Sequence, residues 1–195
     1  DGYKEANPNY VILVTKGVLE ITKAANAWDS KLTIEDWTYG EEAKKPSADA
    51  EFGEVSYKYY ADEECTREIE VPTAAGTYYV KAYVKETTNF TGLESDAAEF
   101  AIAPKTLTYA NIEFTTIDYT GKEIKPEVSI SGLILGRDFE LVYENNVNVG
   151  TATVTITGKG NYEGTLTKEF EITKSTNIWT SELVMEGWTY GDRAK

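Results

Sequence analysis

Histidine is absent from the 195 residues of this chain, and cysteine and methionine occur only once each. Without histidine, the chain has no Ser–His–Asp or Cys–His catalytic arrangement and none of the usual zinc sites. The one cysteine, Cys65, has no partner for an intrachain disulfide. It follows the acidic run Asp62-Glu63-Glu64, and neighbouring carboxylates raise the pKa of a thiol. We therefore expect Cys65 to be a poor nucleophile, and we expect no cofactor.

Basic residues are also scarce: 19 lysines and arginines against 33 acidic residues give a net charge of −14. Such a surface repels phosphate groups, so we expect neither nucleic acid nor an anionic membrane as a partner. No apolar run approaches the length of about 18 residues that a membrane span needs, so we predict no membrane insertion. The chain opens on Asp1, without an initiating Met, a signal peptide or an anchor motif, so we expect a segment of a longer protein.

What the chain has in abundance is strand-forming sequence, including 14 tyrosines. In 151–157, Ala, Val and Ile alternate strictly with four threonines, the period-two pattern of a half-buried strand. Over 77–85, the side chains predicted to face the core are Tyr78, Val80, Ala82 and Val84. The side chains predicted to face outwards on the same strand are Tyr79, Lys81, Tyr83 and Lys85. Turn signals separate such strands with no helical periodicity between them, so we predict an all-β fold.

The chain contains its own repeat. Residues 26–44 recur as 177–195 with 11 of 19 positions identical, an offset of 151 residues (177 minus 26). Three similar segments, each placed soon after an Asn-aromatic pair, look like copies of one terminal strand: 19–23, 100–105 and 170–174. We therefore predict two β-sandwich modules per period, at 25–104 and 105–174. Residues 1–24 would be the tail of a preceding repeat, and 175–195 the start of the next.

Particular segments resemble known bacterial repeats. The runs 119–128, 136–146 and 148–165 are similar to Ig-like repeats of large cell-surface proteins of gut Firmicutes. Residues 37–40, Trp-Thr-Tyr-Gly, and 75–81, Ala-Gly-Thr-Tyr-Tyr-Val-Lys, resemble a companion repeat of the same proteins. The opening segments 7–10 and 17–23 resemble the end of an MBG-type repeat.

This resemblance implies tandem, small, antiparallel Ig-like β-sandwich modules in a rod-like array. It implies a non-catalytic stalk or spacer in an adhesin-type protein, outside a Gram-positive cell and attached to its wall through other regions. Neighbouring repeats of the same chain would be its partners. The absence of disulfides is compatible with such a secreted protein, although a cytosolic chain would have the same cysteine count. The junctions 21–26 and 102–106 contain no Gly/Ser spacer, which favours limited hinge freedom.

The alternative function is capture of a host glycan or a host protein such as an immunoglobulin. Exposed aromatic rings stack on sugars or anchor protein partners, and the candidates are Trp37, Tyr79 and Tyr83. Trp28 and Trp37 recur as Trp179 and Trp188, and core packing or a contact between modules would account for at least one of each pair.

Several other chemistries have weaker support. The run Asp62-Glu63-Glu64 and the turn 144–146 offer oxygen ligands for Ca²⁺, but neither has the spacing of a known calcium loop. A catalytic carboxylate pair needs a cleft that a small sandwich rarely offers, so we predict no enzyme activity. Lys168 is the only lysine on a register predicted to face the core, and we expect no Lys–Asn crosslink.

The repeat also makes a prediction for residues 181–190. They should show a strand pattern with no module of their own to complete it. If ordered, they should pair with a neighbouring chain or pack back on 105–174, because an isolated edge strand is marginal in water.

Overall fold

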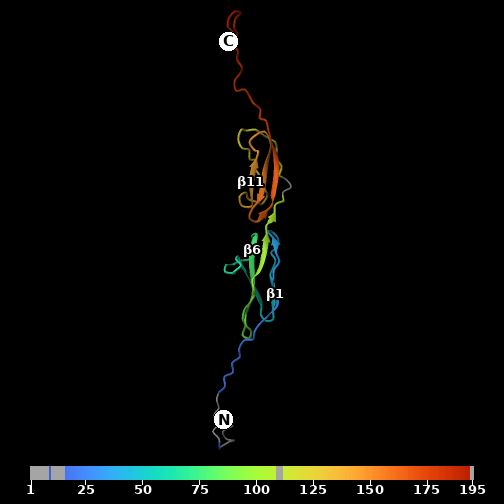
Figure 1. The fold of residues 1–195 in the computed structure, drawn as a ribbon, viewed down its shortest axis with the longest axis vertical. Coiled ribbons are helices and arrows are strands. Elements are labelled where there is room, and N and C mark those ends of the chain that lie inside the picture. The colour runs from blue at the N-terminus through green and yellow to red at the C-terminus, as the bar shows by residue number, and fades with distance from the viewer. Residues whose placement is uncertain (1–8, 10–15, 109–111, 194–195) are drawn as a thin grey trace. The chain divides into compact units, whose positions relative to one another are not determined.

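A computed structural model describes residues 9, 16–108 and 112–193. All regular structure among these residues is β-strand, which confirms the all-β prediction (Figure 1). The strands formed by described residues are β1 (Trp28–Thr33), β2 (Trp37–Thr38), β3 (Ser47–Ala50), β4 (Val55–Tyr60), β5 (Glu68–Ile69), β6 (Gly76–Val84), β7 (Leu93–Glu94), β8 (Ala98–Ala103), β9 (Lys105–Thr106), β10 (Ile117–Asp118), β11 (Phe139–Glu144), β12 (Gly150–Gly158), β13 (Tyr162–Glu163) and β14 (Thr165–Thr173).

The chain divides into two compact units. The first takes in the chain up to Asp36 together with 44–72 and 77–100. The second takes in 37–43, 73–76 and the chain from Ala101 onwards. The second unit therefore includes two short segments that precede its main part in the sequence, and β8 begins in one unit and ends in the other.

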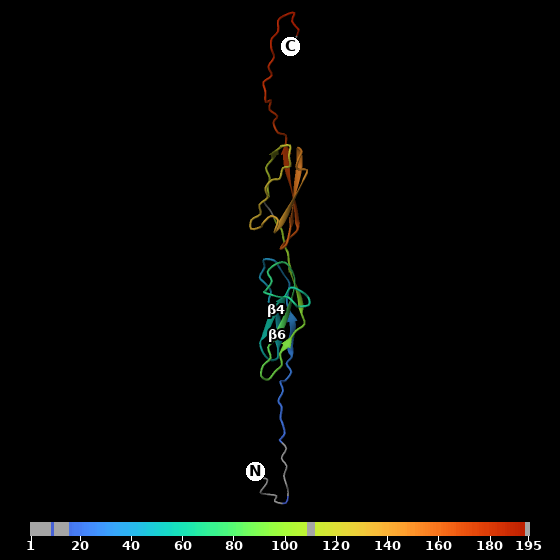
Figure 2. The same ribbon diagram turned by 90° about the vertical axis from the view of Figure 1, so that its left-hand side faces the viewer.

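The larger sheet has the strand order β2-β8-β6-β4-β5, with β7 also paired to β6. β4 and β6 lie side by side and antiparallel, from Val55 opposite Val84 to Tyr60 opposite Tyr79 (Figure 2). β2 runs parallel to β8, with Trp37 opposite Ile102. A separate two-stranded sheet pairs β1 with β3.

The alternation predicted for 77–85 is confirmed on β6, where Val80, Ala82 and Val84 are buried. Phe100 on β8 is buried with them, and the rings of Tyr59 and Tyr78 pack against it. Removing a Val or Phe side chain of this kind from water stabilises the fold by about 1.5–3 kcal/mol. This apolar packing therefore accounts for the long central strand.

The second sheet has the order β10-β14-β12-β11, and β11, β12 and β14 are the orange and red-orange strands of Figure 1. On β12, Ala152, Val154 and Ile156 are fully buried, which confirms the alternation predicted for 151–157. The threonines between them lie on the opposite face. Phe139 and Phe170 complete the core on the two flanking strands.

The core face of this sheet is covered by an irregular segment. Ile124, Val128, Ile130 and Leu133 pack against the buried residues of β12 and its neighbours. Between β10 and β11, residues 119–138 include no strand. Pro126 cannot donate a ladder hydrogen bond, which helps to explain why this covering layer is not a regular sheet.

The two sheets share one order of strands. In each, a short strand runs parallel to the last long strand, β2 beside β8 and β10 beside β14. In each, the tyrosine after the short strand donates its backbone N–H to that last strand: Tyr39 to Ala103 O and Tyr119 to Thr173 O, both at 2.8 Å. β4, β6 and β8 thus correspond to β11, β12 and β14.

Segments 37–43 and 73–76 each make a specific contact with the later part of the second unit. The ring of Tyr39 packs edge-on against Tyr162, with centroids 5.5 Å apart. The backbone N–H of Ala75 donates to Asn161 Oδ1 at 2.8 Å. These contacts explain why 37–43 and 73–76 group with the later part of the chain.

The strand pattern of 181–190 does not form a strand in this structure, so the pairing expected for an ordered strand is not tested. Residues 174–193 form neither strand nor helix, and large apolar side chains such as Leu183 and Val184 are exposed. In the first copy of the repeat, β1 pairs with β3 and β2 pairs with β8. No described strand lies beside the second copy, so the same pattern has no surface on which to bury its apolar residues.

Candidate functional site

Tyr79 and Tyr83 lie on the face of β6 opposite the core residues, as the alternation predicts. We call this surface the tyrosine face and define it by Tyr60, Tyr79, Lys81 and Tyr83. β4 contributes Tyr60, which is directly opposite Tyr79. Both Tyr79 and Tyr83 are only partly exposed.

The hydroxyl groups of Tyr60 and Tyr83 are hydrogen-bonded to each other at 2.8 Å. Tyr60 is only 6% exposed although it lies on the outward face. Burial, followed by the hydrogen bond with Tyr60, raises the pKa of Tyr83 well above its ordinary value. The sequence pattern did not single out Tyr60, because nothing in it shows that an outward tyrosine will be covered.

The remaining polar groups of this face are also engaged. Tyr79 Oη donates to Glu99 Oε2 at 3.1 Å, and Lys81 Nζ lies 2.6 Å from Glu94 Oε1. Burial, and then the bond to Glu99, raises the pKa of Tyr79. The face therefore offers neutral phenols with bonded hydroxyls, suited to ring contacts rather than to acid–base or nucleophilic chemistry.

We predict that Tyr83 stays protonated at a pH where an exposed tyrosine, with a pKa of about 10, is largely ionised. Because its pKa is higher in the folded chain than in the unfolded chain, the unfolded chain ionises first as the pH rises. Stability should therefore fall above about pH 10. The ¹³Cζ resonance of Tyr83, followed by NMR, measures this titration. Tyr60→Phe should lower the pH at the midpoint of the Tyr83 titration. A wild-type midpoint near pH 10, the ordinary value for tyrosine, would contradict the prediction.

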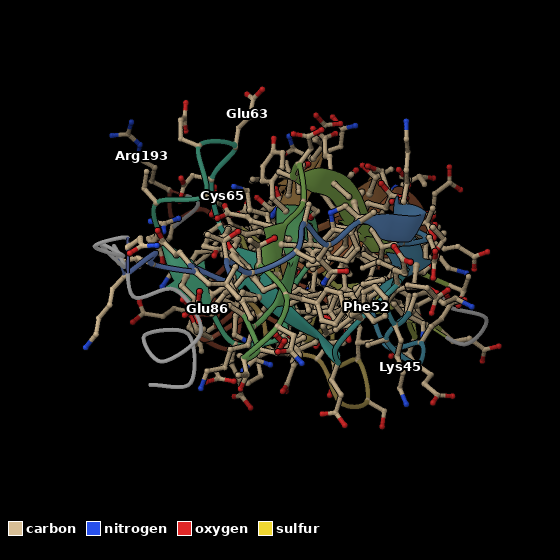
Figure 3. All side chains as sticks on the ribbon, turned by 90° about the horizontal axis from the view of Figure 1, so that it is seen from below. Lys45, Phe52, Glu63, Cys65, Glu86 and Arg193 are labelled. Atoms are coloured by element: carbon tan, nitrogen blue, oxygen red, sulfur yellow. The ribbon has the colours of Figure 1, made fainter. Side chains whose placement is uncertain are left out.

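The acidic loop next to this face is organised by Asp62. Its carboxylate accepts the backbone N–H groups of Thr66 and Arg67, each at 2.8 Å, and the Thr66 hydroxyl at 2.9 Å. The Thr66 N–H is the main cause that lowers the pKa of Asp62. Glu63 extends outwards from the loop tip (Figure 3).

The carboxylate of Asp62, one of the candidate calcium ligands, is therefore hydrogen-bonded within its own loop. The described residues contain no group of three or more Asp, Glu, Cys or His side chains placed to hold a metal ion, and Asp62, Glu63 and Glu64 lie within that range. Asp62 instead closes the turn. In the 144–146 turn, buried Asn146 donates from Nδ2 to Ile124 O at 3.0 Å, so it too has a structural role.

Cys65 has a raised pKa, the direction predicted for it, but the largest cause is burial; nearby Asp62 is a smaller one. Its backbone φ is 53°, a left-handed conformation that is uncommon outside glycine and asparagine. A protonated, partly buried thiol is a poor nucleophile.

The four tryptophans differ in exposure. Trp37 lies on β2 and is 6% exposed, so its ring cannot stack on a ligand in this structure. Its repeat counterpart Trp188 is 48% exposed, and Trp179 is 92% exposed. Trp28 on β1 is partly exposed.

One buried carboxylate was not anticipated from the sequence. The side chain of Asp138 is only 6% exposed. It accepts hydrogen bonds from the Ile134 N–H at 2.8 Å and from the Arg137 guanidinium at 2.8 and 3.0 Å. The Arg137 hydrogen bond is the main cause that lowers the pKa of Asp138. This arrangement closes the turn that leads into β11.

Because its pKa is lowered by folding, Asp138 contributes stability above its unfolded pKa of about 3.9, and that stability is lost as the pH falls. We predict that acidification lowers the Tm of the wild type more than that of Asp138→Asn. Thermal unfolding at a series of pH values measures this, and parallel curves for wild type and Asp138→Asn would refute it.

The residues that the structure describes include no helical segment with the length and hydrophobicity of a membrane span. Comparison with known proteins adds no assignment: no protein-family model matches this chain, and no curated protein matches it either.

Proposed function

We propose that this chain is a non-catalytic extracellular spacer segment of a Gram-positive, adhesin-type cell-surface protein, built from tandem Ig-like β-sandwich modules. The observation that carries the proposal is the repeated topology. The orders β2-β8-β6-β4 and β10-β14-β12-β11 are the same arrangement, used twice in one chain. A spacer requires such repetition of a stable unit and requires no active site.

The polar groups support the same function. On the outward face of β12, threonines lie opposite Glu169 and Glu171 of β14 and Glu140 and Glu144 of β11. This face is polar and acidic, which keeps a long extracellular protein soluble. The hydroxyls of Tyr79 and Tyr83 on the tyrosine face are each hydrogen-bonded within the chain.

A display assay tests this proposal. A reporter domain is anchored to a Gram-positive cell wall directly, or through one or two copies of the full 195-residue chain. Binding of a bulky antigen to the reporter should rise with copy number, because each copy moves the reporter away from the wall. A chain unfolded by Val154→Asp serves as the control. Equal antigen binding with zero, one and two folded copies would rule out a spacer role.

The alternative, capture of a host glycan or host protein, is not favoured at the three residues first proposed for it. Trp37 is buried, and Tyr79 and Tyr83 are only partly exposed. A different part of the first unit, beside Trp28, has features of a ligand site.

A further inference from the structure

A groove lies in the first unit between β1 and the connection from β7 to β8. Its volume is about 310 Å³, at the lower end of the range of roughly 300–1,000 Å³ that small-molecule sites occupy. Trp28, Leu32 and Ala98 supply apolar lining, and Lys31, Glu94 and Asp96 supply charged groups. Small-molecule sites combine apolar surface with placed polar groups, and half of the eight lining residues here are apolar.

The groove stays open because β1 pairs only with β3. Its register is irregular, with Trp28 opposite Ala50 and Thr33 opposite Ser47. The connection on the other side is fixed to β6 instead: Ser95 Oγ accepts the Ala82 N–H at 2.9 Å and donates to Asp96 O at 2.7 Å. The two walls are thus held by different strands, and no backbone hydrogen bonds between β1 and this connection close the gap.

The charged groups of the groove differ in whether they already form a salt bridge. Glu94 is paired with Lys81 at 2.6 Å. Among the described residues, neither Lys31 nor Asp96 takes part in a salt bridge. Lys81, which does not line the groove, thus neutralises Glu94, and Lys31 and Asp96 are left as one donor and one acceptor beside a partly exposed indole.

We propose that this groove binds a short neutral saccharide. A pyranose ring has an apolar face that stacks on an indole and hydroxyl groups that bond to a carboxylate and an ammonium group, which are the groups found here. The local charge balance and the net charge of −14 disfavour an anionic ligand. The small volume and charged rim disfavour a lipid chain. Trp28 stacks on the ring, while Asp96 accepts from its hydroxyls and Lys31 donates to them.

This site goes beyond the spacer function and is compatible with it. A single shallow groove is expected to bind weakly, but an array that repeats it gains avidity, since linked sites raise the effective concentration of each other. In the second repeat copy, Trp179 and Leu183 match Trp28 and Leu32, whereas Glu182 replaces Lys31. A carboxylate thus stands in that copy at the position of one of the three proposed contacts.

NMR titration of the ¹⁵N-labelled full chain tests the site, with lactose and N,N′-diacetylchitobiose as neutral probes. At least one should shift the Trp28 indole N–H and the Lys31 and Asp96 amides in a saturable way. Trp28→Ala removes the stacking surface, and Asp96→Asn replaces a charged acceptor by a neutral one. Each should weaken binding about tenfold or more. Trp179→Ala, at the exposed counterpart, should leave the affinity unchanged. Asp96→Asn keeps the test valid if Trp28→Ala disturbs the fold.

Three results would overturn the proposal. The first is the absence of saturable shifts at Trp28, Lys31 and Asp96 with either neutral probe. The second is tighter binding of 3′-sialyllactose than of lactose, which would mean that the groove selects an anion. The third is binding that survives both Trp28→Ala and Asp96→Asn. None of these results would affect the display assay, so the spacer function and the saccharide site can fail independently.

Discussion

Phe139→Ala will lower the free energy of unfolding of the second unit by about 3–5 kcal/mol, the usual cost of deleting a buried phenyl ring. Phe139 is 1% exposed and belongs to the cluster that also contains Val128, Val154 and Ile156. Small domains are stable by only about 5–15 kcal/mol, so the loss is a large part of the total. Urea denaturation, followed by the amide signals of β12, measures it.

Val142→Ala on the same strand is the matched control. Val142 is 56% exposed on the outward face, so its removal should change stability by no more than about 0.5 kcal/mol. Equal effects of the two substitutions would contradict the assignment of the core face of β11.

Trp37→Ala is the second substitution with a large expected effect. The indole is buried, and Trp37 is aligned with Ile102 in the parallel pair that joins β2 to β8. Truncation of a buried tryptophan costs about 3–5 kcal/mol. The loss should appear as a lower urea midpoint of the amide signals of β8.

The repeat supplies an unusually close control for this experiment. Trp188 is preceded by glycine instead of aspartate but is followed by the same Thr-Tyr-Gly sequence as Trp37. No described strand lies beside it, so Trp188→Ala should leave the urea midpoint unchanged. A comparable loss for both variants would mean that the second copy is packed in solution, contrary to this structure.

Long strands with one buried face were predictable from the sequence. β6 alternates in burial from Tyr79 to Val84 and β12 from Thr151 to Thr157, and a strict period of two leaves little choice of which side chains face the core. Short strands were not predictable. β2 and β10 have two residues each, too few to show any period, and they are defined by pairing with residues more than 50 positions away.

The candidate site was predictable only in part. Alternation placed Tyr79 and Tyr83 on one face, but the bond between Tyr83 and Tyr60 depends on which strand lies beside β6. Trp37 was proposed as a ligand contact and is buried, because pairing with β8 places it in the core. The groove beside Trp28 is present because β1 pairs with β3 and not with the connection between β7 and β8. The local sequence of either segment does not show this.

The second repeat copy illustrates the same limit. Segments that are identical at 11 of 19 positions form β1 and β2 in one place and no strand in the other, because a strand is stabilised by its neighbours as much as by its own sequence. A sequence match therefore identifies an equivalent segment without establishing that it is folded.

The most direct test of the account is the strand order itself, measured by nuclear Overhauser effects in the isotope-labelled chain. If one module topology is used twice, contacts between Trp37 and Ile102 and between Ile117 and Ile172 will both be present, in a parallel register. Trp188 will show no cross-strand contact. A different neighbour for the 117–118 strand, or an antiparallel register in one of the two pairs, would contradict the repeated topology and with it the basis of the spacer proposal.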